Sequence, residues 1–99
     1  MTVATGERAS AGEALRAARD RVHARAADAE AAQRRCFTIW GLCREARDLL
    51  GFSHRDSSRA VRVADLAYED YRYAAGVADG LREARDAVWN LALQAEASA

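Results

Sequence analysis

Lysine and proline are both absent from this 99-residue sequence, and each absence excludes something. Without lysine the chain has no side-chain amine for Schiff-base chemistry and no P-loop lysine for a bound phosphate. Without proline nothing in the sequence forces a helix to end, and only six glycines punctuate the chain. All fifteen basic residues are arginine, which, with the many alanines, indicates a GC-rich bacterial genome.

Net charge and long apolar runs are lacking too. Fifteen acidic residues balance the arginines, so the chain has no global positive field to attract nucleic acid or an anionic membrane. No apolar run is long enough to span a bilayer, and the first residues, MTVATGERAS, lack the apolar core of a secretory signal. We expect a cytoplasmic protein that does not enter a membrane and whose two cysteines are thiols.

Catalytic and cofactor-binding patterns are not found in the sequence. No serine or cysteine lies in a glycine-flanked elbow, and no glycine-rich loop suits a phosphate. Asp20 and His23 lie one helical turn apart, but the further inward glutamates of a di-iron site are missing. We therefore predict that the protein is not an enzyme and that it binds no cofactor and no metal.

The abundant residues favour helices. Apolar residues make up 51% of the chain, and about half of them are alanine, which forms helices readily but buries little area. Ser10-Ala11-Gly12-Glu13 fits a capping box, in which the serine accepts from a backbone N–H and the glutamate reaches back. This motif predicts a helix start at Ser10, after a flexible tail over residues 1–9.

A second boundary is predicted at Gly51-Phe52-Ser53. Glycine suits the left-handed residue that ends a helix, and Ser53 suits the N-cap of the next helix. We predict an all-α fold with helices over about 10–50 and 54–96, folded back as an antiparallel hairpin in a single helical domain, residues 10–99.

Apolar residues recur every seven residues along both predicted helices, as in a coiled coil. The first helix carries one such row and a second row beginning three residues later: Leu15, Val22, Ala29, Cys36, Cys43 and Leu50, with Ala18, Ala32, Ile39 and Ala46. The second helix repeats the pattern: Ala60, Ala67, Ala74, Leu81, Val88 and Ala95, with Val63, Val77, Ala84 and Leu91. These rows predict the core.

Glycines inside the predicted helices support an alternative fold. Each of Gly41, Gly76 and Gly80 weakens a helix by roughly 1 kcal/mol relative to alanine. The alternative has four shorter helices, broken near Gly41 and Gly80.

A two-helix hairpin of this length is thin, because it cannot cover its whole apolar stripe by itself. We therefore predict a homodimer in which two hairpins form a four-helix bundle. Folding about Phe52 gathers four aromatic residues near the turn, whereas Tyr73 is expected to point elsewhere. The residues predicted for the dimer or partner interface are Cys36, Phe37, Ile39, Trp40, Cys43, Tyr68 and Tyr71.

Three functional hypotheses follow from these patterns. The first is a non-enzymatic, self-associating protein that holds protein partners as an adaptor or assembly subunit. The second is a regulator that contacts nucleic acid through a basic end near the turn, and its candidate residues are Arg44, Arg47, Arg55, Arg59 and Arg62. The third is a thiol or metal sensor that uses Cys36 and Cys43, which we otherwise interpret as small buried apolar residues.

Overall fold

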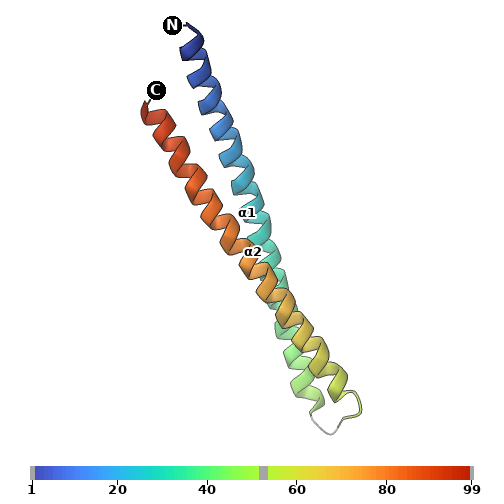
Figure 1. The fold of residues 1–99 in the computed structure, drawn as a ribbon. Coiled ribbons are helices and arrows are strands. Elements are labelled where there is room, and N and C mark those ends of the chain that lie inside the picture. Colours follow the sequence, from blue (N-terminus) through green and yellow to red (C-terminus); the bar gives the residue numbers. More distant parts are fainter. Residues whose placement is uncertain (1, 52–53, 99) are drawn as a thin grey trace. The chain divides into compact units, whose positions relative to one another are not determined.

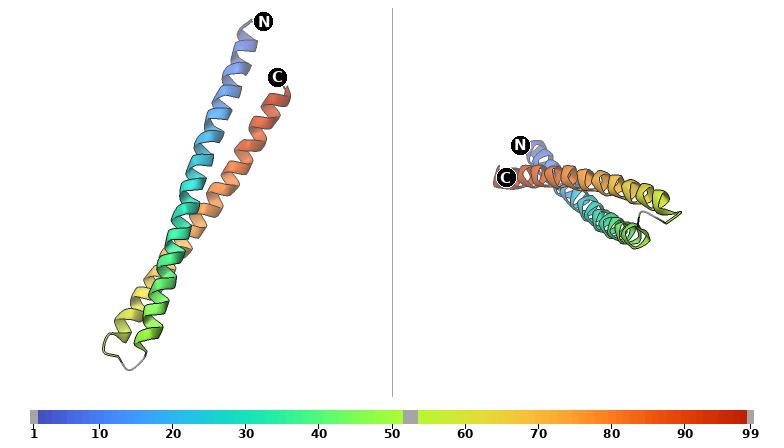
Figure 2. Two further views of the ribbon diagram at one scale, coloured as in Figure 1. Left: turned by 180° about the vertical axis from the view of Figure 1, so that it is seen from behind. Right: turned by 90° about the horizontal axis from the view of Figure 1, so that it is seen from below.

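The computed structural model describes residues 2–51 and 54–98, which form two long α-helices and their connection (Figure 1). α1 spans Thr2–Leu50 and α2 spans Ser57–Ser98. The two helices pack against each other and are antiparallel, joined by the connection at one end (Figures 1 and 2). The predicted all-α helical hairpin is confirmed.

The start of α1 differs from the prediction. α1 begins at Thr2 and not at Ser10, so Ser10 and Glu13 lie inside the helix instead of capping it. Residues 2–9 contain no proline, and Ala4, Glu7 and Ala9 are strong helix formers, so nothing stops the helix from extending toward the N-terminus. The flexibility expected of residues 1–9 stays a prediction.

The end of α1 agrees with the prediction. Gly51 has φ of 68°, the left-handed conformation that glycine adopts without a steric cost. Its backbone N–H donates to the carbonyl oxygen of Arg47 at 3.2 Å, the single bond of an αL helix cap. Glycine at this position therefore ends α1 at Leu50.

The start of α2 lies a few residues later than predicted. The carbonyl oxygen of Asp56 accepts the first helical hydrogen bond, from the N–H of Ala60 at 2.9 Å. The N–H of Asp56 donates to Nδ1 of His54 at 3.1 Å, so the His54 imidazole accepts a backbone hydrogen bond just before the first turn of α2. The predicted N-cap, Ser53, lies outside the described residues.

The alternative of four shorter helices is wrong. α1 continues through Gly41, and α2 continues through Gly76 and Gly80. A helix tolerates an isolated glycine when the surrounding residues form helices well, and alanine and arginine dominate here.

The chain divides into two compact units, each built from both helices. Unit 1 comprises Met1–Asp28 and Asp79–Ala99, and unit 2 comprises Ala29–Ala78, which includes the connection. The described parts of the two units are treated separately below.

Among the residues whose burial the structure describes, every buried one is an alanine. Unit 1 buries Ala26 and Ala92 within its described part, and unit 2 buries Ala64, Ala67 and Ala78. Alanine has a small side chain, so it lets two helix backbones approach closely. Each unit therefore buries little apolar area between its two helices.

The buried row on α2 differs in part from the predicted one. Val63 and Val77 were expected in the core but are exposed, whereas their neighbours Ala64 and Ala78 are buried. Ala64, Ala78 and Tyr71 belong to one row of residues seven apart, four residues beyond the row of Ala60 and Ala67. On α2 the helix contact therefore follows the predicted row of Ala60 and Ala67 and the row of Ala64 and Ala78. The predicted row of Val63 and Val77 lies beside the contact.

Candidate interaction surface

One side of unit 2 is closed by an aromatic cluster, which we define as Phe37, Trp40, Tyr68 and Tyr71. The Trp40 ring lies 4.9 Å from the Tyr68 ring and 5.7 Å from the Tyr71 ring, between centroids. Phe37 meets Tyr71 edge-on at 5.4 Å and Trp40 edge-on at 6.0 Å. The gathering of these four residues predicted from the hairpin geometry is confirmed.

Arginines stack on the aromatic cluster from outside. The guanidinium carbon of Arg44 lies 4.3 Å from the centroid of the Trp40 ring, and that of Arg72 lies 6.0 Å from the Tyr68 ring. Cation–π contacts at such distances contribute about 0.5–1 kcal/mol each where solvent has access. On this side the large apolar residues find partners within their own chain.

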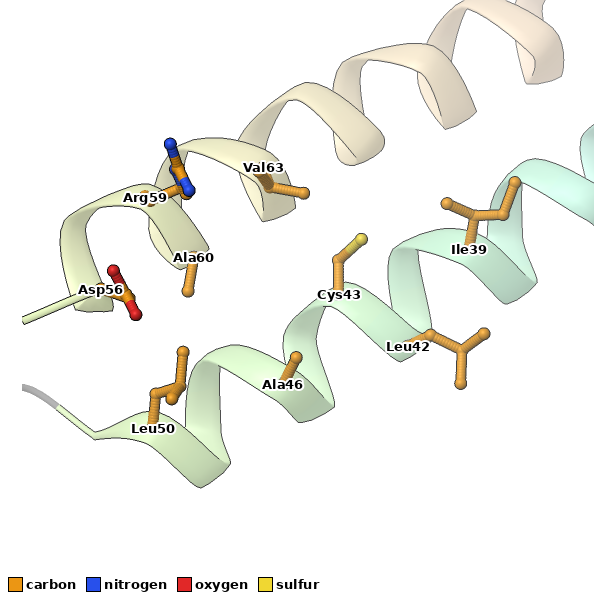
Figure 3. Close-up of a pocket in the computed structure, with 9 residues that line it drawn as sticks. All are labelled: Ile39, Leu42, Cys43, Ala46, Leu50, Asp56, Arg59, Ala60 and Val63. Carbon is orange, nitrogen blue, oxygen red and sulfur yellow. The ribbon is translucent and has the colours of Figure 1, made fainter. Parts of the chain in front are cut away.

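The other side of unit 2 is hollowed near the connection. A pocket of about 530 Å³ lies between α1 and α2 and opens to solvent (Figure 3). Figure 3 shows Cys43 and Leu50 of α1 pointing toward α2, and Ala60 of α2 pointing toward α1. The walls are mostly aliphatic: Ile39, Leu42, Cys43, Ala46, Leu50, Asp56, Arg59, Ala60 and Val63.

A second hollow of about 340 Å³ lies further along the same side of unit 2. Its lining is again mostly apolar: Ala29, Ala32, Cys36, Asp70, Tyr73, Ala74 and Val77. Residues seven apart share one side of a helix. On α1, Ile39 of the first hollow lies seven residues from Ala32 of the second, and on α2, Val63 of the first lies fourteen residues from Val77 of the second. The two hollows therefore belong to one continuous face.

This surface, which we call the apolar face, carries large side chains that the chain leaves exposed. Leu42 is 60% exposed, and Tyr73 is 77% exposed. Leu66 is 61% exposed and belongs to the face because it lies seven residues from both Arg59 and Tyr73. Its large members are Ile39, Leu42, Val63, Leu66, Tyr73 and Val77. Exposed apolar residues clustered in this way mark an interaction site more often than scattered ones do.

The structure divides the residues predicted for the interface into two groups. Cys36, Ile39 and Cys43 line the apolar face. Phe37, Trp40, Tyr68 and Tyr71 form the aromatic cluster on the other side of unit 2. Sequence reasoning missed Leu42 and Leu66, although Leu42 lies seven residues from Leu49 and Leu66 lies seven from Tyr73, which is a spacing signal that the sequence contains.

The two cysteines are free thiols and are partly buried, Cys36 in the second hollow and Cys43 in the first. A separation of seven residues on a continuous helix places their Cα atoms about 10.5 Å apart, too far for a disulfide. Within residues 2–51 and 54–98, no group of three or more histidine, cysteine, aspartate or glutamate residues is arranged to hold a metal ion.

Three of the five candidate arginines near the connection, Arg44, Arg47 and Arg55, have an acidic or aromatic neighbour. Besides the contact of Arg44 with Trp40, Nε of Arg47 donates to Oδ1 of Asp48 at 3.3 Å. Nε of Arg55 lies 4.0 Å from Oδ2 of Asp56, although the Arg55 side chain itself is almost fully exposed. Arg59 lines the first hollow, and Arg62 is exposed on the surface of α2.

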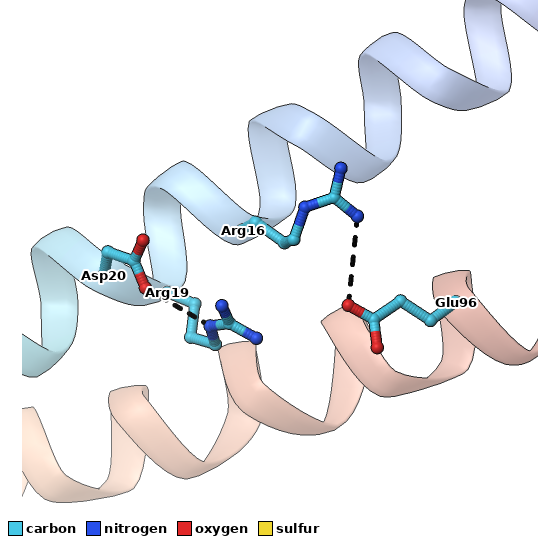
Figure 4. A network of polar contacts seen from close by, with 4 residues as sticks. All are labelled: Arg16, Arg19, Asp20 and Glu96. Carbon is cyan, nitrogen blue, oxygen red and sulfur yellow. Dashed lines mark hydrogen bonds and ion pairs between the residues drawn. The ribbon is translucent and has the colours of Figure 1, made fainter.

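In unit 1 polar side chains connect the two helices. Nη1 of Arg16 lies 3.8 Å from Oε1 of Glu96 across the helix pair (Figure 4). The guanidinium of Arg19 donates to Asp20 at 3.4 Å and also lies 5.0 Å from the centroid of the Trp89 ring. These exposed contacts are individually weak.

Comparison with known proteins finds no matching family model, no matching curated protein and no matching solved structure. In the part of the chain that the structure describes, neither helix has a stretch long and apolar enough to cross a membrane.

Proposed function

We propose that this protein is a non-enzymatic, self-associating helical protein that acts as a protein interaction or assembly subunit. The observation that carries the proposal is the apolar face of unit 2, where leucine, isoleucine and valine side chains are exposed while the buried residues are alanines. Covering apolar surface contributes roughly 25 cal/mol for each Å² removed from water. A partner that covers this face therefore supplies stabilisation that the two helices do not obtain from each other.

The chemistry of the two hollows favours an interaction over a reaction. Aliphatic side chains, alanines and one thiol in each hollow make up most of the lining. The aspartate and arginine side chains of the lining are Asp56 and Arg59 in the first hollow and Asp70 in the second. Catalytic pockets converge several polar groups on one reacting atom, whereas interface cores are apolar with charges at the rim.

The simplest form of this function is a homodimer that presents the remaining surface to other proteins. We place it in the cytoplasm, because the two free cysteines are compatible with a reducing compartment. The exposed, uncharged ring of Tyr73 at the edge of the second hollow suits a contact with protein, since tyrosine is enriched in interfaces.

Sedimentation equilibrium of the purified full chain tests the proposal. A helical protein that sediments above the monomer mass at micromolar concentration, and dissociates on dilution, is the expected result. A chain that stays a stable, fully helical monomer through the same concentration range would contradict self-association.

A further inference from the structure

We infer that the apolar face of unit 2 binds a second copy of this chain, face to face across a two-fold axis. The inference rests on the proposed self-association and identifies the surface that carries it. Each copy then contributes the same six large side chains: Ile39, Leu42, Val63, Leu66, Tyr73 and Val77. The aromatic cluster stays outside this interface, in contrast to the interface predicted from the sequence.

The periodicity of the chain supports a helical partner of the same kind. In a four-helix bundle the core consists of two rows on each helix, offset by three residues. Ile39, Val63 and Val77 belong to the second of these rows on their helices, and they are exposed in the single chain. A second hairpin laid on the apolar face places these residues in a bundle core, where the sequence pattern predicts them.

The size of the face suits a dimer. The α1 part of unit 2, residues 29–50, is about 33 Å long at 1.5 Å per residue, and two helices side by side are about 20 Å wide. The face therefore covers about 660 Å² before side-chain relief is added, close to the roughly 800 Å² that each partner buries in a stable complex.

Charged residues border the apolar face, and their signs alternate around it. On α1, Glu45 lies one turn from Leu42 on the side of the connection, and Arg35 lies two turns away in the opposite direction. On α2, positive residues lie toward the connection and negative residues away from it: Arg59, Arg62, Glu69 and Asp70. Asp56 adds one negative charge near the connection but has His54 and Arg55 beside it.

These bordering charges are available to a partner. All six side chains, Glu45, Arg35, Arg59, Arg62, Glu69 and Asp70, belong to exposed residues, and none of them forms an ion pair with another described residue. The apolar face thus has four corners, one at each end of each helix, and neighbouring corners carry opposite charges. When two copies meet face to face, a two-fold axis in the plane of the face, either along or across the helices, places each corner opposite one of the other sign. The face is thus electrostatically complementary to itself.

Leucine substitutions test the apolar part of the interface. Leu42→Gln and Leu66→Gln remove apolar groups from the face, and both sites are exposed enough that the helices should remain intact. Leu93→Gln is the matched control, because Leu93 is 48% exposed and lies on α2 in unit 1. We expect each face variant to raise the dissociation constant of the dimer about tenfold or more, with little change for the control.

Charge reversals provide a second test that leaves the apolar residues unchanged. Arg35→Glu should weaken association about two- to tenfold, and one further reversal should restore it. Restoration by Glu69→Arg places the two connections at the same end of the dimer, and restoration by Glu45→Arg places them at opposite ends. Either result supports a second copy on the apolar face.

The inference and the proposed function fail in different ways. A wild-type chain that remains monomeric contradicts both. If the wild type associates, but the leucine and charge variants associate as tightly as the control, the copies meet through another surface and this inference is wrong. Circular dichroism of each variant confirms that the helices are retained.

Discussion

The indole ring of Trp40 on α1 lies stacked on the phenol ring of Tyr71 on α2, with centroids 5.7 Å apart and planes at 13°. This contact of two partly buried rings joins the two helices inside unit 2, where the fully buried residues are the small Ala64, Ala67 and Ala78. Aromatic pairs contribute about 0.5–1.5 kcal/mol beyond the area that they bury. The pair therefore helps to fix how the helices align.

Replacing Trp40 with alanine should destabilise unit 2 more than any exposed substitution does. We expect Trp40→Ala to lower the free energy of unfolding by about 2–4 kcal/mol, because it removes three ring contacts and the stacked Arg44. Trp89→Ala is the matched control, since Trp89 is half exposed and the one described contact of its ring is with the guanidinium of Arg19. The control should cost about 1 kcal/mol. Urea unfolding at one protein concentration measures both, and equal losses would contradict the role of the cluster.

Replacing glycine with alanine should lower the stability of the protein at one position and raise it at another. Gly51→Ala is expected to cost about 1 kcal/mol, because alanine is strained at a φ of 68°. Gly41→Ala should stabilise by about 0.5–1 kcal/mol, since its added Cβ would meet no atom within 4 Å and alanine favours the helix. Thermal unfolding followed by circular dichroism measures both. A gain in stability from Gly51→Ala would show that the αL cap does not fix the end of α1.

The cysteines should behave as apolar side chains and not as ligands. We expect Cys36→Ala and Cys43→Ala to leave the helical content unchanged and to alter stability by about 1 kcal/mol or less, because both residues are only partly buried. Titration of the reduced protein with Co²⁺ should produce no thiolate-to-metal absorption band. Such a band, lost in both variants, would favour the sensor hypothesis instead.

Nucleic acid binding should be weak and independent of the arginines near the connection. Asp48 and Asp56 lie beside Arg47 and Arg55, and these acids oppose phosphate binding. We expect the wild type and an Arg55→Ala, Arg59→Ala double variant to show the same weak binding to duplex DNA at low salt. Fluorescence anisotropy measures it. Tight binding by the wild type that salt and the double variant both abolish would instead establish a basic contact surface.

The two helices, the end of α1 and the aromatic cluster could be predicted from the sequence, because each depends on local chemistry or on the hairpin register. Gly51 has the conformational freedom that a helix end needs, and Trp40 and Tyr68 meet once the chain folds back at that point. The start of α1 could not be predicted, since a capping box such as Ser10 to Glu13 also fits inside an alanine-rich helix.

The rows that line the helix contact could be predicted only in part. Val63 and Ala64 are both apolar, so a spacing rule chooses the larger residue for the core, but the structure buries Ala64 and exposes Val63. Two helices alone bury only the residues directly between their axes, and alanine permits the closest approach there. Which residues remain exposed beside the helix contact depends on whether Val63 or Ala64 is buried. For this reason Leu42 and Leu66 were not predicted as part of the candidate interface.

The alanine interior also determines how this protein responds to heat and dilution. Among the residues whose burial the structure describes, those fully buried between the helices are alanines, so apart from the aromatic cluster unfolding exposes little apolar surface, and its heat-capacity change should be small for a single chain of this length. In the proposed dimer, most of that change would come from the surface between the two copies. Because the copies of the proposed dimer would separate on dilution, its melting temperature should rise with protein concentration, and in the cell the abundance of the chain would set its folded fraction.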